Sequence, residues 1–494
     1  MHPVNRETVL QGTKNFAGLV ILTVLALLVQ GYHPGLEDDA YYLAAIKRDL
    51  NPALFPHDAD FFRVLFQATL FDKLIALSVR WTHLPLEWAL FLWQCAATFL
   101  VLWGCWRIAR RCFSEEHAQW AAVALVAALL TLPVAGSALS LSDQHLHPRT
   151  LATALILAAI VAVLDGRRVL AGALLLAAFP LHLNMTPFGV SFCLFLMWKP
   201  QPAERSSVVA AAGLVLPLQW MFEPASDTWR RAEATRSFYF LLQWHWYEWL
   251  GVVGPLLLLW WFRWLALGRG SMVMARVAER TVYFGVFQLA VALILMLPPR
   301  LERFRSLEPM RYLHLVYLLF VLLSGGLLGR YVLKRHALRW LLLFVPLGAG
   351  MFYAQRQLYP ATVHLELPGV PSGNVWIEAF RWISANTPVD SQFALDPQYM
   401  EMDGEDYHGF RALAERSVLA DAVKDPCIVV RVPSLGPRWV REVDAQQGWR
   451  DFREADFRRL KAQFGVNWVV LTQPVAAGMA CPYRSQRLAV CRVE

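Results

Sequence analysis

Charged side chains are scarce in this sequence. Only 17% of its 494 residues are Asp, Glu, Lys or Arg, whereas 57% are apolar and 21 are tryptophan. Soluble domains carry about 25% charged residues. The apolar residues also come in blocks of about 17 to 20, the length at which a helix crosses a hydrocarbon core about 30 Å thick. The composition therefore predicts a membrane protein rather than a chain of soluble domains.

The chain also lacks the motifs of several soluble enzyme classes. It contains no Walker loop, dinucleotide fingerprint, zinc-protease helix or nucleophile elbow. A nucleotide-sugar donor on the cytoplasmic side therefore has no support. Despite a net charge of +8, the Lys and Arg residues lie between apolar blocks rather than along one face with interleaved aromatics, so no nucleic acid is expected as a partner. The spacing of the cysteines in the apolar region suggests no metal site.

The basic residues between the apolar blocks predict how the chain threads the bilayer, because Lys and Arg are retained on the cytoplasmic side of short loops. The first block, residues 16–32, has no small-x-small cleavage site after it and is expected to remain as an anchor. With the N-terminus in the cytoplasm, an odd count places the C-terminal part outside. The eleven expected spans cover about residues 16–32, 86–108, 120–134, 150–164, two in a hairpin around 182–187, 208–221, 249–267, 281–297, 312–328 and 340–352.

The segment between the first two spans, residues 33–85, is expected to form an outer loop. Within it, residues 62–81 contain Arg63, Asp72, Lys73 and Arg80, so this amphipathic piece should lie on the membrane surface. A true span there would place the basic cluster at residues 107–111 on the wrong side. The expected domains are therefore a multi-span α-helical region, 1–365, that includes this loop, and a soluble extracytoplasmic α/β domain, 366–494.

The tail has the pattern of a small α/β unit. Residues 376–386 predict a helix that ends at Asn386-Thr387-Pro388, and strands are expected at 392–395, 428–432 and 467–471. Helices are expected at 435–443 and 455–464. Cys481 and Cys491 bracket a hairpin at 482–490; they can pair as a disulfide in an oxidising compartment or remain two thiols.

Three consecutive carboxylates, Glu37, Asp38 and Asp39, follow the first span and precede Tyr42. Side by side near a membrane they repel one another and lose hydration, which favours the binding of a cation or a proton. The alternative is a solvated helix start, in which Asp38 or Asp39 caps the helix running to Asp49. Both interpretations stay open on physical grounds alone.

Other outer loops carry basic residues that break the positive-inside trend. His145, His147 and Arg149 precede the fourth span, and Arg311 follows three other arginines between the ninth and tenth. Binding of a phosphate would offset their charge there. For the histidines the alternatives are polar interface residues or metal contact, and for Arg311 interfacial anchoring or pairing with Glu308. The loop 223–248 adds arginines and aromatics, which suit either sugar stacking or an aromatic belt.

An acidic pair and an aromatic residue on the first outer loop, an amphipathic surface segment, about eleven spans and an outer C-terminal domain together resemble the GT-C membrane glycosyltransferases. Among bacterial members the likeness is to the lipid-linked sugar transferases of the protein-mannosyl and aminoarabinose kind. The resemblance implies that Asp38 is the catalytic base or a metal ligand, with Asp39 where glutamate is commoner and Tyr42 at the aromatic place. Glu37 is a third candidate, because the assignment can shift by one residue.

The resemblance further implies an inverting transfer of a sugar from a polyprenyl-phosphate carrier to an acceptor glycan, lipid or protein on the outer face of a bacterial inner membrane. A divalent metal ion at Asp38 and Asp39 is a candidate cofactor. The sequence leaves two other functions open. A transporter or flippase of lipid-linked saccharides needs mid-span charges and an inverted repeat, which this chain hardly shows. A noncatalytic membrane assembly protein has no specific feature in its favour.

Overall fold

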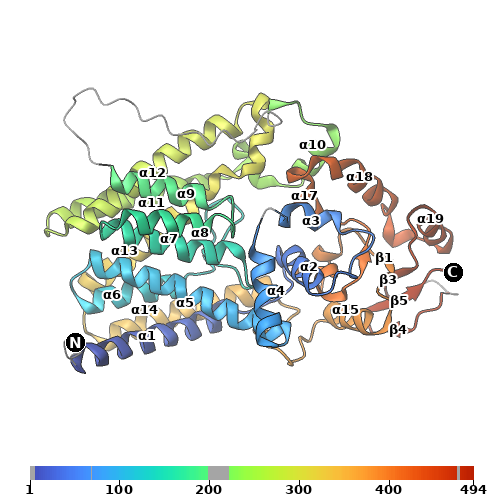
Figure 1. Ribbon diagram of the computed structural model, residues 1–494, viewed down its shortest axis with the longest axis horizontal. Helices are drawn as coiled ribbons and strands as arrows, with labels where there is room; N and C mark the ends of the chain where they lie inside the picture. Colours follow the sequence, from blue (N-terminus) through green and yellow to red (C-terminus); the bar gives the residue numbers. More distant parts are fainter. Residues whose placement is uncertain (1–5, 68, 199–221, 475–478) are drawn as a thin grey trace.

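In a computed structural model, the described residues are 6–67, 69–198, 222–474 and 479–494. They form two parts along the long axis (Figure 1): a bundle of long helices that holds the N-terminus, and a mixed region around a small sheet that holds the C-terminus. The span expected at residues 208–221 lies outside the described residues.

Ten helices make up the described part of the bundle. Six helical segments are long and apolar enough to cross a membrane: those of α1, α5, α11, α12 and α14, and α13 together with the helical turns on either side of it, Pro309–Leu333. Helices α7, α8 and α9 are apolar but shorter, and α6 ends at Ala128 rather than near residue 134 as expected. The predicted count of eleven spans is therefore not confirmed. The helices are α1 (Arg6–Gln30), α5 (Leu86–Cys112), α6 (Glu116–Ala128), α7 (Pro148–Leu164), α8 (Arg168–Ala178), α9 (Thr186–Met197), α11 (Trp246–Leu267), α12 (Met272–Met296), α13 (Leu313–Leu328) and α14 (Ala337–Leu358).

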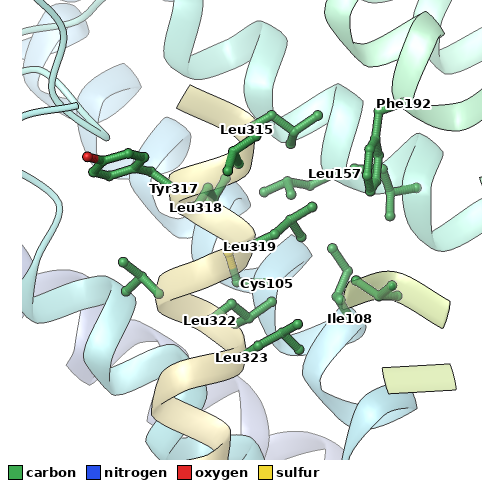
Figure 2. Packing of buried hydrophobic residues seen from close by; sticks show 14 of the residues in the cluster. Cys105, Ile108, Leu157, Phe192, Leu315, Tyr317, Leu318, Leu319, Leu322 and Leu323 are labelled. Carbon is green, nitrogen blue, oxygen red and sulfur yellow. The ribbon is translucent and has the colours of Figure 1, made fainter. Parts of the chain in front are cut away.

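Helix α13 occupies the centre of the bundle, because nearly all of its side chains are buried. Figure 2 shows its leucines beside Cys105 and Ile108 of α5 and Leu157 of α7. On another face α13 meets α6 through small residues: a Cβ added to Gly325 would lie 2.6 Å from the Ala121 carbonyl oxygen. Such small residues allow two helix backbones to approach closely, as is common within membranes.

Helix α14 presents the opposite pattern. Leu338, Leu341, Leu342 and Val345 point away from the protein, with exposed fractions of 59% to 67%. A face of this kind would be unfavourable in water and suits hydrocarbon. We therefore interpret the outer surface of the bundle as lipid-facing.

Polar links mark the two ends of the bundle. At the end away from the sheet, Arg111 pairs with Asp165 at 2.5 Å and Arg330 pairs with Glu115 at 2.7 Å. At the other end, Tyr32 and His33, which follow α1, are bonded to residues 364–366 of the tail. Arg111 and Arg330, two of the basic residues predicted to be cytoplasmic, thus lie at the end opposite the tail.

The tail contains a five-stranded sheet with the strand order β2-β1-β3-β5-β4. Strand β1 runs parallel to β2 and β3, and β5 runs antiparallel to β3 and β4. A disulfide joins Cys481 to Cys491 of β5. The strands are β1 (Gln392–Ala394), β2 (Ser417–Val418), β3 (Trp468–Thr472), β4 (Tyr483–Arg484) and β5 (Leu488–Arg492), and the helices are α15 (Val375–Asn386), α16 (Phe410–Ala414), α17 (Asp425–Arg431), α18 (Gly436–Ala445) and α19 (Glu454–Phe464).

The strand predicted at residues 428–432 is wrong, because this segment belongs to helix α17. A short apolar run such as Ile428-Val429-Val430 is compatible with either a buried strand or a buried helix. The deciding signal lies just before it, where Asp425 and Pro426 occupy the first turn, as is typical of a helix N-terminus.

The first outer loop packs against the tail. It forms α2 (Asp39–Leu50), α3 (Asp60–Phe66) and α4 (Phe71–Thr82), so the single surface helix predicted at 62–81 is in fact two helices separated by a turn. One buried apolar cluster combines aromatic residues of α2 and α3 with Trp229 of α10 (Asp227–Ala234), Val429 of α17 and Trp439 of α18. The loop and the tail therefore share a core.

Candidate active site

A cavity of about 420 Å³ lies where the bundle meets the tail. Its size falls within the range of about 300 to 1,000 Å³ that is usual for small-molecule sites. Every segment that lines it was predicted to be outside the cytoplasm or adjoins an outer loop. The charged residues and the histidine in its lining are Glu37, Asp38, Asp143, His145, Arg149, Arg236, Glu308, Arg311, Lys424 and Arg431.

The acidic turn before α2 is held by the tail. The Glu37 amide donates to the Tyr407 carbonyl at 2.9 Å, and the Gly409 amide donates to the Gly35 carbonyl at 2.8 Å. Glu37 has a φ of 56°, a left-handed conformation that is uncommon for a residue with a side chain. This turn directs the carboxylates of Glu37 and Asp38 into the cavity.

The structure separates the two aspartates that the sequence presents as a pair. Asp39 is buried, its Oδ2 accepts a 2.6 Å hydrogen bond from the Gly35 amide, and it does not line the cavity. Burial raises its pKa. Asp39 therefore stabilises the acidic turn. Asp38 occupies the N-cap position of α2 without a side-chain capping bond, so the predicted cap is not made by this residue.

The carboxylate of Asp38 faces the cavity, with 39% of its side chain exposed. Its Oδ1 lies 3.4 Å from Lys424 Nζ, and its Oδ2 lies 3.7 Å from His147 Nε2. Burial disfavours the charged form, but Lys424, then His147 and Arg311, outweigh it and hold the pKa of Asp38 well below its usual range. Asp38 is therefore ionised near neutral pH.

Lys424 reaches the acidic turn from the start of α17. Its ammonium group forms a short ion pair with Glu37, and the residue is 6% exposed. The Lys424 amide donates to Asp421 Oδ1, as do the amides of Val423 and Asp425, so three successive backbone groups fix this turn. The position of the ammonium group is thus set by the backbone as well as by its partners.

A buried arginine ties this turn to the first outer loop. Arg411 of α16 donates to Asp58 at 2.5 Å and to both oxygens of Asp425 at 2.9 and 3.1 Å. Asp58 also accepts from the Val418 amide. The two carboxylates are fully buried and share one guanidinium group, so this link is costly to break.

The histidines predicted from the outer loop before the fourth span lie in an extended segment before α7. Ring centroids of His145 and His147 are 5.9 Å apart, and His147 stands between Tyr42 at 5.0 Å and His182 at 5.9 Å. Burial, then the repulsion from Arg149, outweighs the attraction of Asp143 and lowers the pKa of His147 to about 4. His147 is therefore neutral at pH 7, with its Nδ1 accepting from the Arg149 amide at 3.0 Å.

Two of the predicted arginines are paired with carboxylates. Arg149 donates to Asp143 at 2.5 Å, and Arg311 forms a short ion pair with Glu308, which was one of the alternatives considered for it. Glu308 also accepts from Arg431 at 3.0 Å and from the Tyr239 hydroxyl at 3.3 Å. One carboxylate thus serves two guanidinium groups, and the Arg311-Glu308-Arg431 cluster keeps a positive charge.

A smaller cavity of about 110 Å³ adjoins the first. Asp38, Arg311, Cys427 and Arg431 line both spaces and so lie between them. The rest of the smaller lining is more apolar and comes from α2, the segment before α4, the start of α7, the loop between α8 and α9, and α17; it consists of Tyr41, Tyr42, Thr69, Pro148, Leu181, His182, Leu183, Asn184 and Ile428.

Several buried polar atoms of the larger cavity have no hydrogen-bond partner within the described protein. They include both ring nitrogens of His145, the hydroxyl of Thr131 and Nε of Arg149 and Arg236. Buried polar groups are normally hydrogen-bonded, because an unmade bond costs about 1 to 3 kcal/mol. These atoms suit a ligand that is rich in hydroxyl groups.

The candidate divalent metal does not fit this arrangement. Among the described residues, no three or more His, Cys, Asp or Glu side chains are grouped so that they can hold a metal ion. Asp39 does not line the cavity that Asp38 faces, and Lys424 Nζ lies against both Glu37 and Asp38, where a bridging cation would be. We therefore assign no step of a reaction to a metal.

Sequence reasoning named most of these residues but missed Arg431, and it gave Lys424 no role. Arg431 was assigned to the end of a strand. The sequence signal that could have identified it is the pair Asp425 and Pro426, which is typical of the first turn of a helix. A helix that begins there has Arg431 in its last turn.

The chain matches no protein-family model and no curated protein. Among solved structures it matches the oligosaccharyltransferase of Archaeoglobus fulgidus, crystallised with zinc and sulfate. The match covers 92% of this chain and 68% of that chain, with 12% sequence identity and a TM-score of 0.44. At this level of similarity the match supports no functional argument, so the proposals below rest on the geometry of the two cavities.

Proposed function

We propose that this protein is a membrane glycosyltransferase that moves a sugar from a polyprenyl-phosphate carrier to a hydroxyl acceptor, with Asp38 as the catalytic base. The reaction takes place at the tail end of the bundle, on the extracytoplasmic face. This function matches the resemblance to GT-C enzymes noted from the acidic turn, but its support comes from the cavities.

The observation that carries the proposal is the position of Asp38 relative to the other carboxylates. Glu37, Asp143 and Glu308 each form a close ion pair with a cation, whereas the nearest cation to Asp38, the Lys424 ammonium group, lies 3.4 Å away and the neutral His147 ring lies 3.7 Å away. Asp38 also lies between the two cavities. It is therefore the least tightly paired of these carboxylates and the one placed to accept a proton from a substrate hydroxyl.

The two cavities suit two different substrates. The smaller one combines Arg311 and Arg431 with leucines of the α8–α9 loop, so it suits a phosphate whose hydrocarbon chain continues toward the lipid. The larger one has the unpartnered polar atoms that a hydroxyl-rich molecule can satisfy. We assign the donor phosphate to the smaller cavity and the acceptor to the larger.

In the proposed reaction, the acceptor oxygen forms a bond to the anomeric carbon while the bond from that carbon to the phosphate oxygen breaks. The bonding electrons leave with the phosphate, whose growing negative charge is stabilised by Arg311 and Arg431. The acceptor proton passes to ionised Asp38 as positive charge develops on the attacking oxygen. A single displacement of this kind inverts the anomeric configuration.

The test is sugar transfer by an Asp38→Asn variant, which keeps the shape of the side chain but cannot accept the proton. With a labelled lipid-linked sugar in reconstituted membranes, we expect kcat to fall about 100- to 10,000-fold. The matched control is Asp60→Asn, since Asp60 is an exposed acid in the same loop and lies outside both cavities. Full transfer by the Asp38 variant would end the assignment.

A further inference from the structure

The ammonium group of Lys424 lies in the place that a divalent cation would take beside the acidic turn. It contacts the carboxylates of both Glu37 and Asp38, and the Lys424 residue is 6% exposed. A metal ion bridging the same two carboxylates would overlap this group and meet like-charge repulsion from it. We propose that Lys424 is a positioning residue that replaces a catalytic metal in this protein; the reaction to which this applies is the one proposed above.

The surrounding structure holds the Lys424 ammonium group in a fixed position beside the acidic turn. Three backbone amides, of Val423, Lys424 and Asp425, donate to Asp421 Oδ1 and fix the turn that carries it. The link from Arg411 to Asp58 and Asp425 then fixes that turn against the first outer loop. The loop and the tail thus bring opposite charges together across 386 residues of sequence.

The role of Lys424 follows from its two contacts. Its ion pair with Glu37 occupies that carboxylate, and its longer contact with Asp38 Oδ1 holds Asp38 ionised and in one orientation. Asp38 Oδ2 then remains for the acceptor. A metal would perform the same ordering of two carboxylates, but a lysine does so without dependence on metal supply.

The experiment measures bound Mn²⁺ by electron paramagnetic resonance, together with sugar transfer, on the purified full-length protein. We expect the wild type to bind no Mn²⁺ that depends on Asp38, and its activity to survive EDTA. A Lys424→Ala variant exposes the two carboxylates and should gain a Mn²⁺ site. That site should disappear in the Lys424→Ala, Asp38→Asn double variant. A merely structural lysine would not produce this gain.

Activity provides the second measurement. A Lys424→Met variant should lose about 10- to 100-fold in kcat, because it loses a hydrogen bond to a charged group. A Lys424→Arg variant keeps the positive charge and should retain more activity than Lys424→Met. The control is Lys47→Met, since Lys47 also joins the first outer loop to the tail, through Glu415 at 2.6 Å, but lies outside the two cavities beside Asp38. This control should stay close to wild type.

Two results would overturn the proposal. One is a wild type that binds Mn²⁺ through Asp38 and loses activity in EDTA. The other is a Lys424→Met variant that folds and is as active as the wild type. The Mn²⁺ measurement needs no substrate, so it still tests Lys424 if the glycosyltransferase assignment itself fails in the Asp38→Asn assay.

Discussion

Replacing Arg431 with methionine tests whether the charge between the two cavities holds the donor phosphate. Arg311 and Arg431 share Glu308, so two positive charges and one negative charge leave a net charge of +1 in this cluster. Arg431→Met keeps much of the side-chain volume and leaves a neutral Arg311-Glu308 pair. The site would then have no excess positive charge with which to bind the phosphate.

The size of the effect follows from the contact that is lost. A hydrogen bond to a charged group contributes about 1.5 to 3 kcal/mol. At about 1.4 kcal/mol for each factor of ten, kcat/KM for the lipid-linked donor should fall roughly 10- to 150-fold. Initial rates measured over a range of donor concentrations in reconstituted membranes provide this value.

A matched control and a second substitution make the result decisive. Arg438 also lies in the tail, pairs with Glu442 at 2.6 Å and has a 26% exposed side chain, against 27% for Arg431, but it lines neither cavity. Arg438→Met should therefore leave kcat/KM unchanged. Adding Glu308→Gln to Arg431→Met restores a net charge of +1 and should recover part of the loss. An unchanged kcat/KM in Arg431→Met, or a double variant worse than both single variants combined, would refute the reasoning.

Two further predictions concern the support of the site and its protonation. Arg411→Met leaves two buried carboxylates without a cation and should cost about 3 to 5 kcal/mol of stability, measured by denaturant unfolding; an unchanged midpoint would show that the link between loop and tail is unimportant. The pKa of Asp38 is lowered, so its ionised form persists as the pH falls, and kcat/KM should stay level from about pH 8 to about pH 5. A loss of activity centred near pH 6 to 7 would contradict Asp38 as the base.

The general architecture was predictable because it depends on local patterns. Long apolar blocks gave the six membrane-length helices, and the basic clusters correctly separated the end of the bundle around Arg111 and Arg330 from the end that carries the tail. The number of spans was less certain, because α6 to α9 are too short to be recognised by length alone.

The site was predictable only in part, for reasons that lie in long-range contacts. The acidic turn and Arg311 stood out because charges near a membrane require compensation. The distinction between Asp38 and Asp39 depends on the left-handed Glu37 and on the bond from Gly35, which the sequence does not reveal. Lys424 meets Asp38 only through folding of the tail onto the first outer loop.

The most direct measurement is the structure of the protein with an uncleaved polyprenyl-phosphate sugar analogue in the membrane, at a resolution that shows the phosphate. We predict the phosphate next to Arg311 and Arg431 in the smaller cavity, with the anomeric carbon facing Asp38 and the larger cavity. A phosphate bound elsewhere, with Asp38 remote from the sugar, would contradict the account.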